Sequence, residues 1–278
     1  MIIDAHQHFW HFDPVRDAWI DESMAAIQRD FLPQDLRPEL EARGIDGCVA
    51  VQADQSLAQN DFLLGLARGH DFVRGVVGWV DLRSKEAAAQ LNRYAANPAF
   101  VGVRHVVQAE SAGFMLDRDF QAGVSLLRDH GLTYDILIHR GQLPEALLLA
   151  RAFPEQPFVL DHLAKPVADG QLDPAWEDGI RALAECGNVS CKLSGLVTEA
   201  PGYCWDYEQL LPYVTTVLDA FGPRRLLYGS DWPVCRVAAT YEAQLEVYRR
   251  ALASLSEADR VLIFGGNAAR FYGLDEGD

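Results

Sequence analysis

The chain has 278 residues, of which 49% are hydrophobic, and this is enough for one large globular domain. It carries 24 Lys and Arg against 40 Asp and Glu, and the formal net charge of −16 argues against nucleic acid or an anionic membrane as the main partner. The sequence shows neither a signal-peptide pattern nor a run of about 18 apolar residues, so we expect a cytoplasmic protein with a small-molecule partner. Monomer and homodimer both stay open.

Eight short apolar runs, most of them rich in β-branched residues, predict strands. They lie at residues 1–6, 47–53, 73–82, 100–107, 133–139, 158–163, 188–195 and 225–233. Most of these runs are continuous instead of alternating, which is typical of parallel strands buried on both faces.

Segments with helical periodicity separate these runs. The clearest are residues 84–97, 116–131, 173–187 and 206–222, several of which begin at Asp or Ser and end at Gly. Eight alternations of strand and helix, with no linker or low-complexity tract, predict a single-domain (β/α)8 barrel over residues 1–278. An open doubly wound sheet is the alternative, although neither a GxGxxG nor a GxxxxGK[ST] phosphate motif is present.

Polar residues gather at the carboxyl ends of the predicted strands, where barrel enzymes have their active sites. In chain order they are His6 and His8, Gln52 and Asp54, Trp79 and Asp81, Arg104 and His105, His139 and Arg140, His162 and Lys165, Lys192 and Ser194, and Asp231 and Trp232. Side chains two apart in a strand point to the same face, so His6 and His8 should reach one place. Four strand-end histidines and one Asp would converge on a catalytic or metal site if the barrel closes.

Several candidate positions have a competing structural interpretation. Of the neighbours Arg104 and His105 only one can face the interior, and we expect Arg104. Lys192 could contact substrate or form a structural ion pair. Asp161 should face outward or cap a turn, because it is adjacent to His162 in a strand. Trp19 could contact substrate or simply pack within the long first loop.

Six segments together resemble one known family. They are DAHQHFW, GVRHVVQ, HLAKP, KLSG, GSDWPV and GGNAARFYGL, and they run from the first strand to the last helix. The chain resembles the amidohydrolase superfamily, in particular its sugar-lactonase branch with the fuconolactone and rhamnonolactone hydrolases and the related pyrone-dicarboxylate lactonase. This resemblance implies a distorted (β/α)8 barrel.

The resemblance also implies a place for a metal. In metal-dependent relatives the positions matching His6, His8, His139 and Asp231 hold a divalent cation, with the position matching His162 close by. The fourth strand offers no lysine that could bridge two ions, so at most a single cation such as zinc is expected. Relatives in the lactonase branch can work without a metal, and we therefore predict that no cofactor is required.

The predicted reaction is hydrolysis of a neutral aldonolactone such as L-fuconolactone. Asp231, with a reference pKa of about 3.9, is the predicted general base. Arg104 and the histidines would polarise the carbonyl, and His162 would help them or protonate the leaving oxygen. The predicted substrate contacts are Lys165, Lys192, Trp232 and Trp10. The alternatives are a metal-dependent decarboxylase or amide hydrolase of the same superfamily, and a barrel that only binds.

Overall fold

Eight parallel strands form one sheet in the order β1 to β8. The computed structural model describes residues 1–274, and its strands are β1 Ile3–Gln7, β2 Gly47–Val51, β3 Val73–Gly78, β4 Phe100–His105, β5 Thr133–Ile136, β6 Phe158–Leu160, β7 Val189–Leu193 and β8 Leu226–Tyr228. Each strand lies within, or within one residue of, a predicted apolar run, which confirms the (β/α)8 barrel. Most runs extend past the strands because the strand ends continue into loops that carry polar side chains.

The barrel is nearly closed, with a seam between β8 and β1. We use the word seam for the two backbone hydrogen bonds that join these edges: Asp231 N–H donates to His6 O at 2.8 Å, and His8 N–H donates to Trp232 O at 2.7 Å. Gly229 permits this approach, since a Cβ there would come within 2.7 Å of the His6 Cβ. The nearly closed barrel agrees with the distorted barrel that the family resemblance implies.

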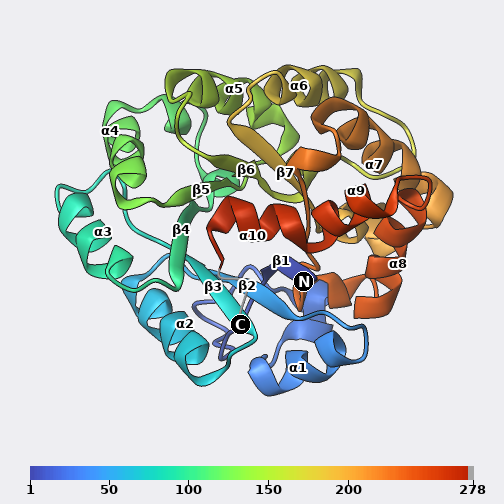
Figure 1. Ribbon diagram of the computed structural model, residues 1–278, viewed down its shortest axis with the longest axis horizontal. Helices are drawn as coiled ribbons and strands as arrows, with labels where there is room; N and C mark the ends of the chain where they lie inside the picture. Colours follow the sequence, from blue (N-terminus) through green and yellow to red (C-terminus); the bar gives the residue numbers. More distant parts are fainter. Residues whose placement is uncertain (275–278) are drawn as a thin grey trace.

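Helices surround the sheet, as Figure 1 shows. They are α1 Pro33–Glu41, α2 Leu57–Gly69, α3 Ala87–Ala95, α4 Arg118–Leu127, α5 Leu143–Ala152, α6 Pro174–Ala184, α7 Tyr207–Phe221, α8 Tyr241–Ala251, α9 Glu257–Val261 and α10 Asn267–Tyr272. The four clearest predicted segments contain α3, α4, α6 and α7. Asp117, Asp173 and Asp206 cap three of them by accepting backbone N–H groups of the first turn.

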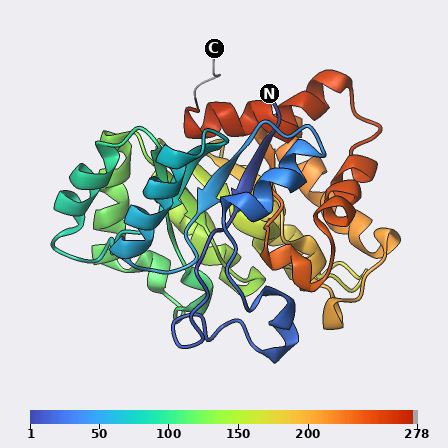
Figure 2. The ribbon, with the colours of Figure 1, turned by 90° about the horizontal axis from the view of Figure 1, so that it is seen from below.

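The two ends of the barrel differ in character. At the amino end, apolar strand residues such as Ile3, Val49 and Leu227 pack with Ala268 and Tyr272 of α10 in one buried cluster. The loop after β1, residues 9–32, lies at the opposite end (Figure 2). No helix of the described chain is both long and apolar enough to span a membrane.

Candidate active site

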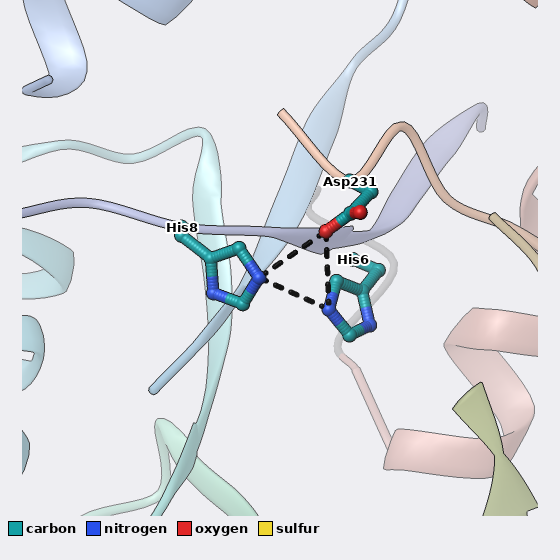
Figure 3. A group of neighbouring side chains, drawn as sticks. All are labelled: His6, His8 and Asp231. Atoms are coloured by element: carbon teal, nitrogen blue, oxygen red, sulfur yellow. Dashed lines mark hydrogen bonds and ion pairs between the residues drawn. The ribbon is translucent and has the colours of Figure 1, made fainter. Parts of the chain in front are cut away.

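His6, His8 and Asp231 meet at the seam, at the carboxyl ends of the strands. His6 Nε2 and His8 Nε2 lie 3.2 Å apart, and Asp231 Oδ1 lies 3.3 Å from the second and 3.8 Å from the first. Figure 3 shows the three side chains pointing toward one another. The register between β1 and β2 shifts between Asp4 and Gln7, next to His6. The seam bonds then fix Asp231 against β1.

A left-handed turn brings His162 to the same place. Residues 162–165, none of them glycine, have φ values of 52°, 55°, 56° and 50°, a conformation that costs roughly 1–2 kcal/mol per residue. Trp176 Nε1 donates to Leu163 O at 2.8 Å, and Lys165 N–H donates to His162 O at 2.8 Å. The surrounding packing thus holds a strained segment in place, which is typical of functional sites.

The turn directs the His162 ring toward Asp231. His162 Nε2 lies 4.0 Å from Asp231 Oδ1, while its Nδ1 lies 2.9 Å from Ser194 Oγ of the loop after β7. Burial lowers the pKa of His162 to about 4. The ring is therefore neutral at pH 7 and can exchange hydrogen bonds without carrying charge.

Four buried charges lie beneath the histidines. Lys192 Nζ donates to Asp135 and lies 3.0 Å from Asp161 Oδ1, and Arg104 Nη1 lies 3.2 Å from Asp161 Oδ2. Tyr272 of α10 donates its hydroxyl to Asp135 at 2.9 Å. Two cations balance two carboxylates, as buried charges require.

The prediction that Asp161 faces outward is wrong. Asp161 is fully buried, and its Oδ1 lies 3.3 Å from His6 Nδ1. Asp161 lies two residues after Val159, which belongs to the interior cluster, so strand alternation gives both residues the same inward face. His162 would then face outward, but its positive φ turns the ring back into the barrel.

His6 lies between two cations. Lys192 Nζ is 3.1 Å from its Nδ1, and Arg104 Nη1 is 3.3 Å from its Nε2. Burial lowers the pKa of His6 well below its ordinary value, and the positive charge of Lys192 acts in the same direction against the attraction of Asp161. His6 is therefore a neutral imidazole at pH 7.

Asp231 is ionised. Burial alone would raise its pKa, but the field of His162 and the hydrogen bond with His8 outweigh burial and lower the pKa below its usual value. The site thus holds one carboxylate against three imidazoles at neutral pH.

A cavity of about 400 Å³ opens above these groups. It is lined by His8, Arg16, Trp19, Ala53, Asp54, Gln55, Arg104, Val106, Gln108, Ala109, Leu137, His162, Lys165, Asp231 and Val234. Its size is in the range of small-molecule sites. Asp231 and Arg104 form its floor, with 6% and 4% of their side chains exposed.

Of the four predicted substrate contacts, the structure places one in the cavity lining and three outside it. Lys165 lines the cavity and lies 3.7 Å from Glu199. Lys192 is fully buried beneath His6 and does not line the cavity. Trp232 and Trp10 are also buried outside the lining: Trp232 packs against Phe9 and Phe31, and Trp10 donates to Arg29 O.

Two further histidines lie away from the cluster. His139 is exposed, three residues beyond the end of β5, and its backbone N–H donates to the Gln142 side chain. Its role as a ligand or electrophile stays a prediction. His105 accepts from Trp79 Nε1 and pairs with Glu110 at 2.8 Å, so Arg104 is the inward member of that pair.

Comparison with known proteins agrees with this geometry. The family model described as amidohydrolase matches residues 3–274. The chain belongs to the amidohydrolase family. An L-fucono-1,5-lactonase of Burkholderia ambifaria is 40% identical over 98% of this chain and 96% of its own, and one of Burkholderia multivorans is 38% identical over 99% and 96%. A crystal structure of a Burkholderia multivorans amidohydrolase with bound zinc matches at a TM-score of 0.95 and 36% identity, covering 99% of this chain and 100% of that one.

The residues of this amidohydrolase fit a single divalent cation. Ligand atoms of His6, His8 and Asp231 all lie within 4.8 Å of one another. Val51 O, which can only accept, lies 2.8 Å from His8 Nδ1, so Nδ1 carries a proton and Nε2 faces Asp231 Oδ1. Two lone pairs cannot face each other at 3.3 Å unless a proton or a cation lies between them. A second group, His6, Asp161 and His162, has the same spread, but Asp161 is already paired with Lys192.

Proposed function

We propose that this hydrolase opens a neutral sugar-acid lactone, an aldonolactone such as L-fuconolactone, to the open-chain aldonic acid, with Asp231 as general base. The observation that carries the proposal is an ionised, buried carboxylate facing three imidazoles on the floor of a cavity of about 400 Å³. The lactone is chosen because relatives 38% and 40% identical over nearly the whole chain are named L-fucono-1,5-lactonases.

Asp231 activates the attacking water. Its carboxylate takes a proton as the water oxygen bonds to the lactone carbonyl carbon, a role worth about a hundredfold or more in rate. A lowered pKa keeps Asp231 ionised but makes it a weak base. The carbonyl must therefore be polarised strongly at the same time.

Arg104 supplies positive charge to the carbonyl oxygen. The Arg104 guanidinium lines the cavity and is held from behind by Asp161 and by Gln52 O. His8 lies beside Arg104 in the cavity lining, and its ring is oriented by the hydrogen bond that Nδ1 donates to Val51 O at 2.8 Å. Donors fixed before the reaction stabilise the tetrahedral oxyanion without further rearrangement.

The leaving group needs a proton when the ring C–O bond breaks. His162 Nε2 lies 4.0 Å from Asp231 Oδ1, beyond direct hydrogen-bond distance, so transfer of the proton from water through His162 to the ring oxygen requires the two groups to move closer when substrate is bound. The balance is one water consumed, one C–O bond formed, one broken, and Asp231 returned to its ionised state.

A divalent cation would be held by His6, His8 and Asp231, and when bound it would polarise the carbonyl and lower the pKa of water. We propose that no cofactor is required, because base, electrophile and proton carrier each have a candidate among the chain's own residues. The cytoplasmic location and the choice between monomer and homodimer stay predictions.

A lactone panel tests the proposal. Hydrolysis of L-fuconolactone and other neutral aldonolactones is followed with a pH indicator, before and after exhaustive chelation with the residual metal counted. Turnover of lactones that survives chelation supports the proposal in full. Turnover lost on chelation and restored by zinc contradicts the cofactor-free part, and no turnover on any lactone contradicts the function and favours a decarboxylase or amide hydrolase.

A further inference from the structure

The rim of the cavity carries a cation and an aromatic ring from the loop after β1. Arg16 and Trp19 both line the cavity, yet 38% of the Arg16 side chain and 45% of Trp19 are exposed. The floor residues Arg104 and Asp231 are only 4% and 6% exposed. The two loop residues therefore lie at the outer part of the cavity, away from the atoms assigned to the chemistry.

Arg16 is fixed in position by Asp17. Arg16 Nε lies 2.8 Å from Asp17 Oδ1 and Nη2 lies 2.7 Å from Asp17 Oδ2, a two-point contact, and Nη2 also donates to His11 O. Asp17 itself is buried and accepts the backbone N–H of Asp13 at 2.9 Å. Such a clamp removes most of the rotamer freedom that an exposed arginine would lose on binding a ligand.

The clamp leaves one end of the guanidinium free. Within residues 1–274, Nη1 of Arg16 makes no hydrogen bond, although Nε and Nη2 are both engaged. Trp19 packs edge-on against the buried Trp10, with ring centroids 6.1 Å apart. The rim thus presents a preset donor and an aromatic ring to the same cavity.

An acceptor completes this outer surface. Asp54, after β2, lines the cavity, and one of its carboxylate oxygens accepts the Ser56 hydroxyl at 2.5 Å. Its other oxygen makes no hydrogen bond among the residues that the structure describes. A donor, an acceptor and an aromatic face are the three features that bind a hydroxylated ring.

We propose that Arg16, held by Asp17, is a specificity-determining residue that binds hydroxyl groups of the lactone ring away from the reacting carbonyl, with Trp19 and Asp54 beside it. This inference rests on the proposed lactonase function and extends it to the substrate class. Arg16 binds substrate, whereas Asp17 is a positioning residue. Neither takes part in the bond changes at the carbonyl.

The test compares two lactones on purified full-length protein. One is a polyhydroxylated aldonolactone and the other is δ-valerolactone, which has the ester but no hydroxyl groups. For Arg16→Met we expect kcat/KM on the aldonolactone to fall about tenfold or more through KM, because a charge-assisted hydrogen bond is lost. We expect kcat on the aldonolactone, and both constants on δ-valerolactone, to stay within about twofold.

Asp17→Asn tests the positioning. It should raise KM for the aldonolactone less than Arg16→Met does, and it should have no further effect in the Arg16→Met background, because both changes act through one guanidinium. Arg29→Met is the matched control: Arg29 belongs to the same loop, is half exposed and packs over Phe31, but does not line the cavity. Circular dichroism and thermal unfolding establish that each variant is folded.

Three outcomes distinguish failure of this inference from failure of the proposed lactonase function. Loss of selectivity in Arg16→Met but not in Arg29→Met supports the proposal. An equal fall on both lactones, or no change on either, overturns the role of Arg16 while the lactonase function stands. Wild-type protein that hydrolyses neither lactone overturns the proposed function itself.

Discussion

The floor and the rim of the cavity are built by different parts of the chain. The floor residues Asp231 and Arg104 come from strand ends, and His6 and Lys192 lie buried beneath them among backbone bonds and balanced charges. Rim residues Arg16 and Trp19 come from one irregular loop and are partly exposed. On the proposed function, the barrel positions the reacting groups, and we expect changes in the separate loop to alter selectivity without disturbing them.

The sharpest test of the floor is Asp231→Asn. The substitution keeps the shape but removes the base, so we expect hydrolysis of an aldonolactone to fall by about 10²–10⁴ while folding is largely retained. Steady-state kinetics with circular dichroism measures both effects. The exposed Asp129→Asn should leave the rate unchanged. A near wild-type rate in Asp231→Asn would remove this residue as the base.

Lys192→Met tests whether the buried charges act as a unit. It leaves the carboxylates of Asp135 and Asp161 without their common cation, and we expect a loss of about 3–5 kcal/mol in the free energy of unfolding. Urea denaturation measures the loss. Adding Asp135→Asn should restore part of it, since one uncompensated charge then disappears. An unchanged denaturation midpoint in Lys192→Met would show that the pair contributes little.

Arg104→Met should lower the rate of hydrolysis and leave stability largely unchanged, with an effect on the rate no larger than that of Asp231→Asn. Asp161 keeps Lys192 as a partner, so the fold should persist, while loss of a fixed donor to the oxyanion lowers kcat by about 10²-fold. Kinetics on the aldonolactone and on δ-valerolactone should show the same loss, because both share the carbonyl. Arg118→Met, at an exposed site, is the control. Unchanged kcat would exclude Arg104 as the electrophile.

The smallest expected effect lies at the rim. Trp19→Ala removes the aromatic face and should raise KM for the aldonolactone several-fold, about the scale of one stacking contact, with kcat retained. Val15→Ala, on the same loop and 86% exposed, serves as control. If Trp19→Ala lowers kcat as strongly as Arg104→Met does, then rim and floor are not separate in function.

Sequence reasoning works where the structure is periodic. Continuous apolar runs and capped helical segments give all eight strands and the clearest helices, since both follow from which faces are buried. The same alternation selects Arg104 over His105. It fails at residues 162–165, where four left-handed residues turn the His162 ring inward although the strand alternation gives that face to its neighbour Asp161. No local sequence pattern predicts a run of positive φ values in residues other than glycine.

The sequence predicts only part of the rim: Trp19 is a candidate for substrate contact, and Arg16 is not. Arg16 belongs to a loop without periodicity, and its place above the site follows from a tertiary contact with Asp17 and from the path of the chain. Tyr272 of the last helix donates to Asp135 beneath the histidines, and no strand-end rule includes a helix residue. The sequence predicts His139 at a strand end, since the apolar run covers residues 133–139, whereas β5 ends at Ile136.

Because of the seam, the site can form only when the chain after β8 is present. His6 lies in the first strand and Asp231 follows the last one. The hydrogen bonds between them join positions that are separated by almost the whole barrel sequence. Closing such a loop has a high entropic cost, so it depends on the preceding strands being in place. A nascent chain or a proteolytic fragment that ends directly after β8 therefore lacks Asp231, the proposed general base. We expect such a fragment to have no hydrolase activity, instead of a reduced one.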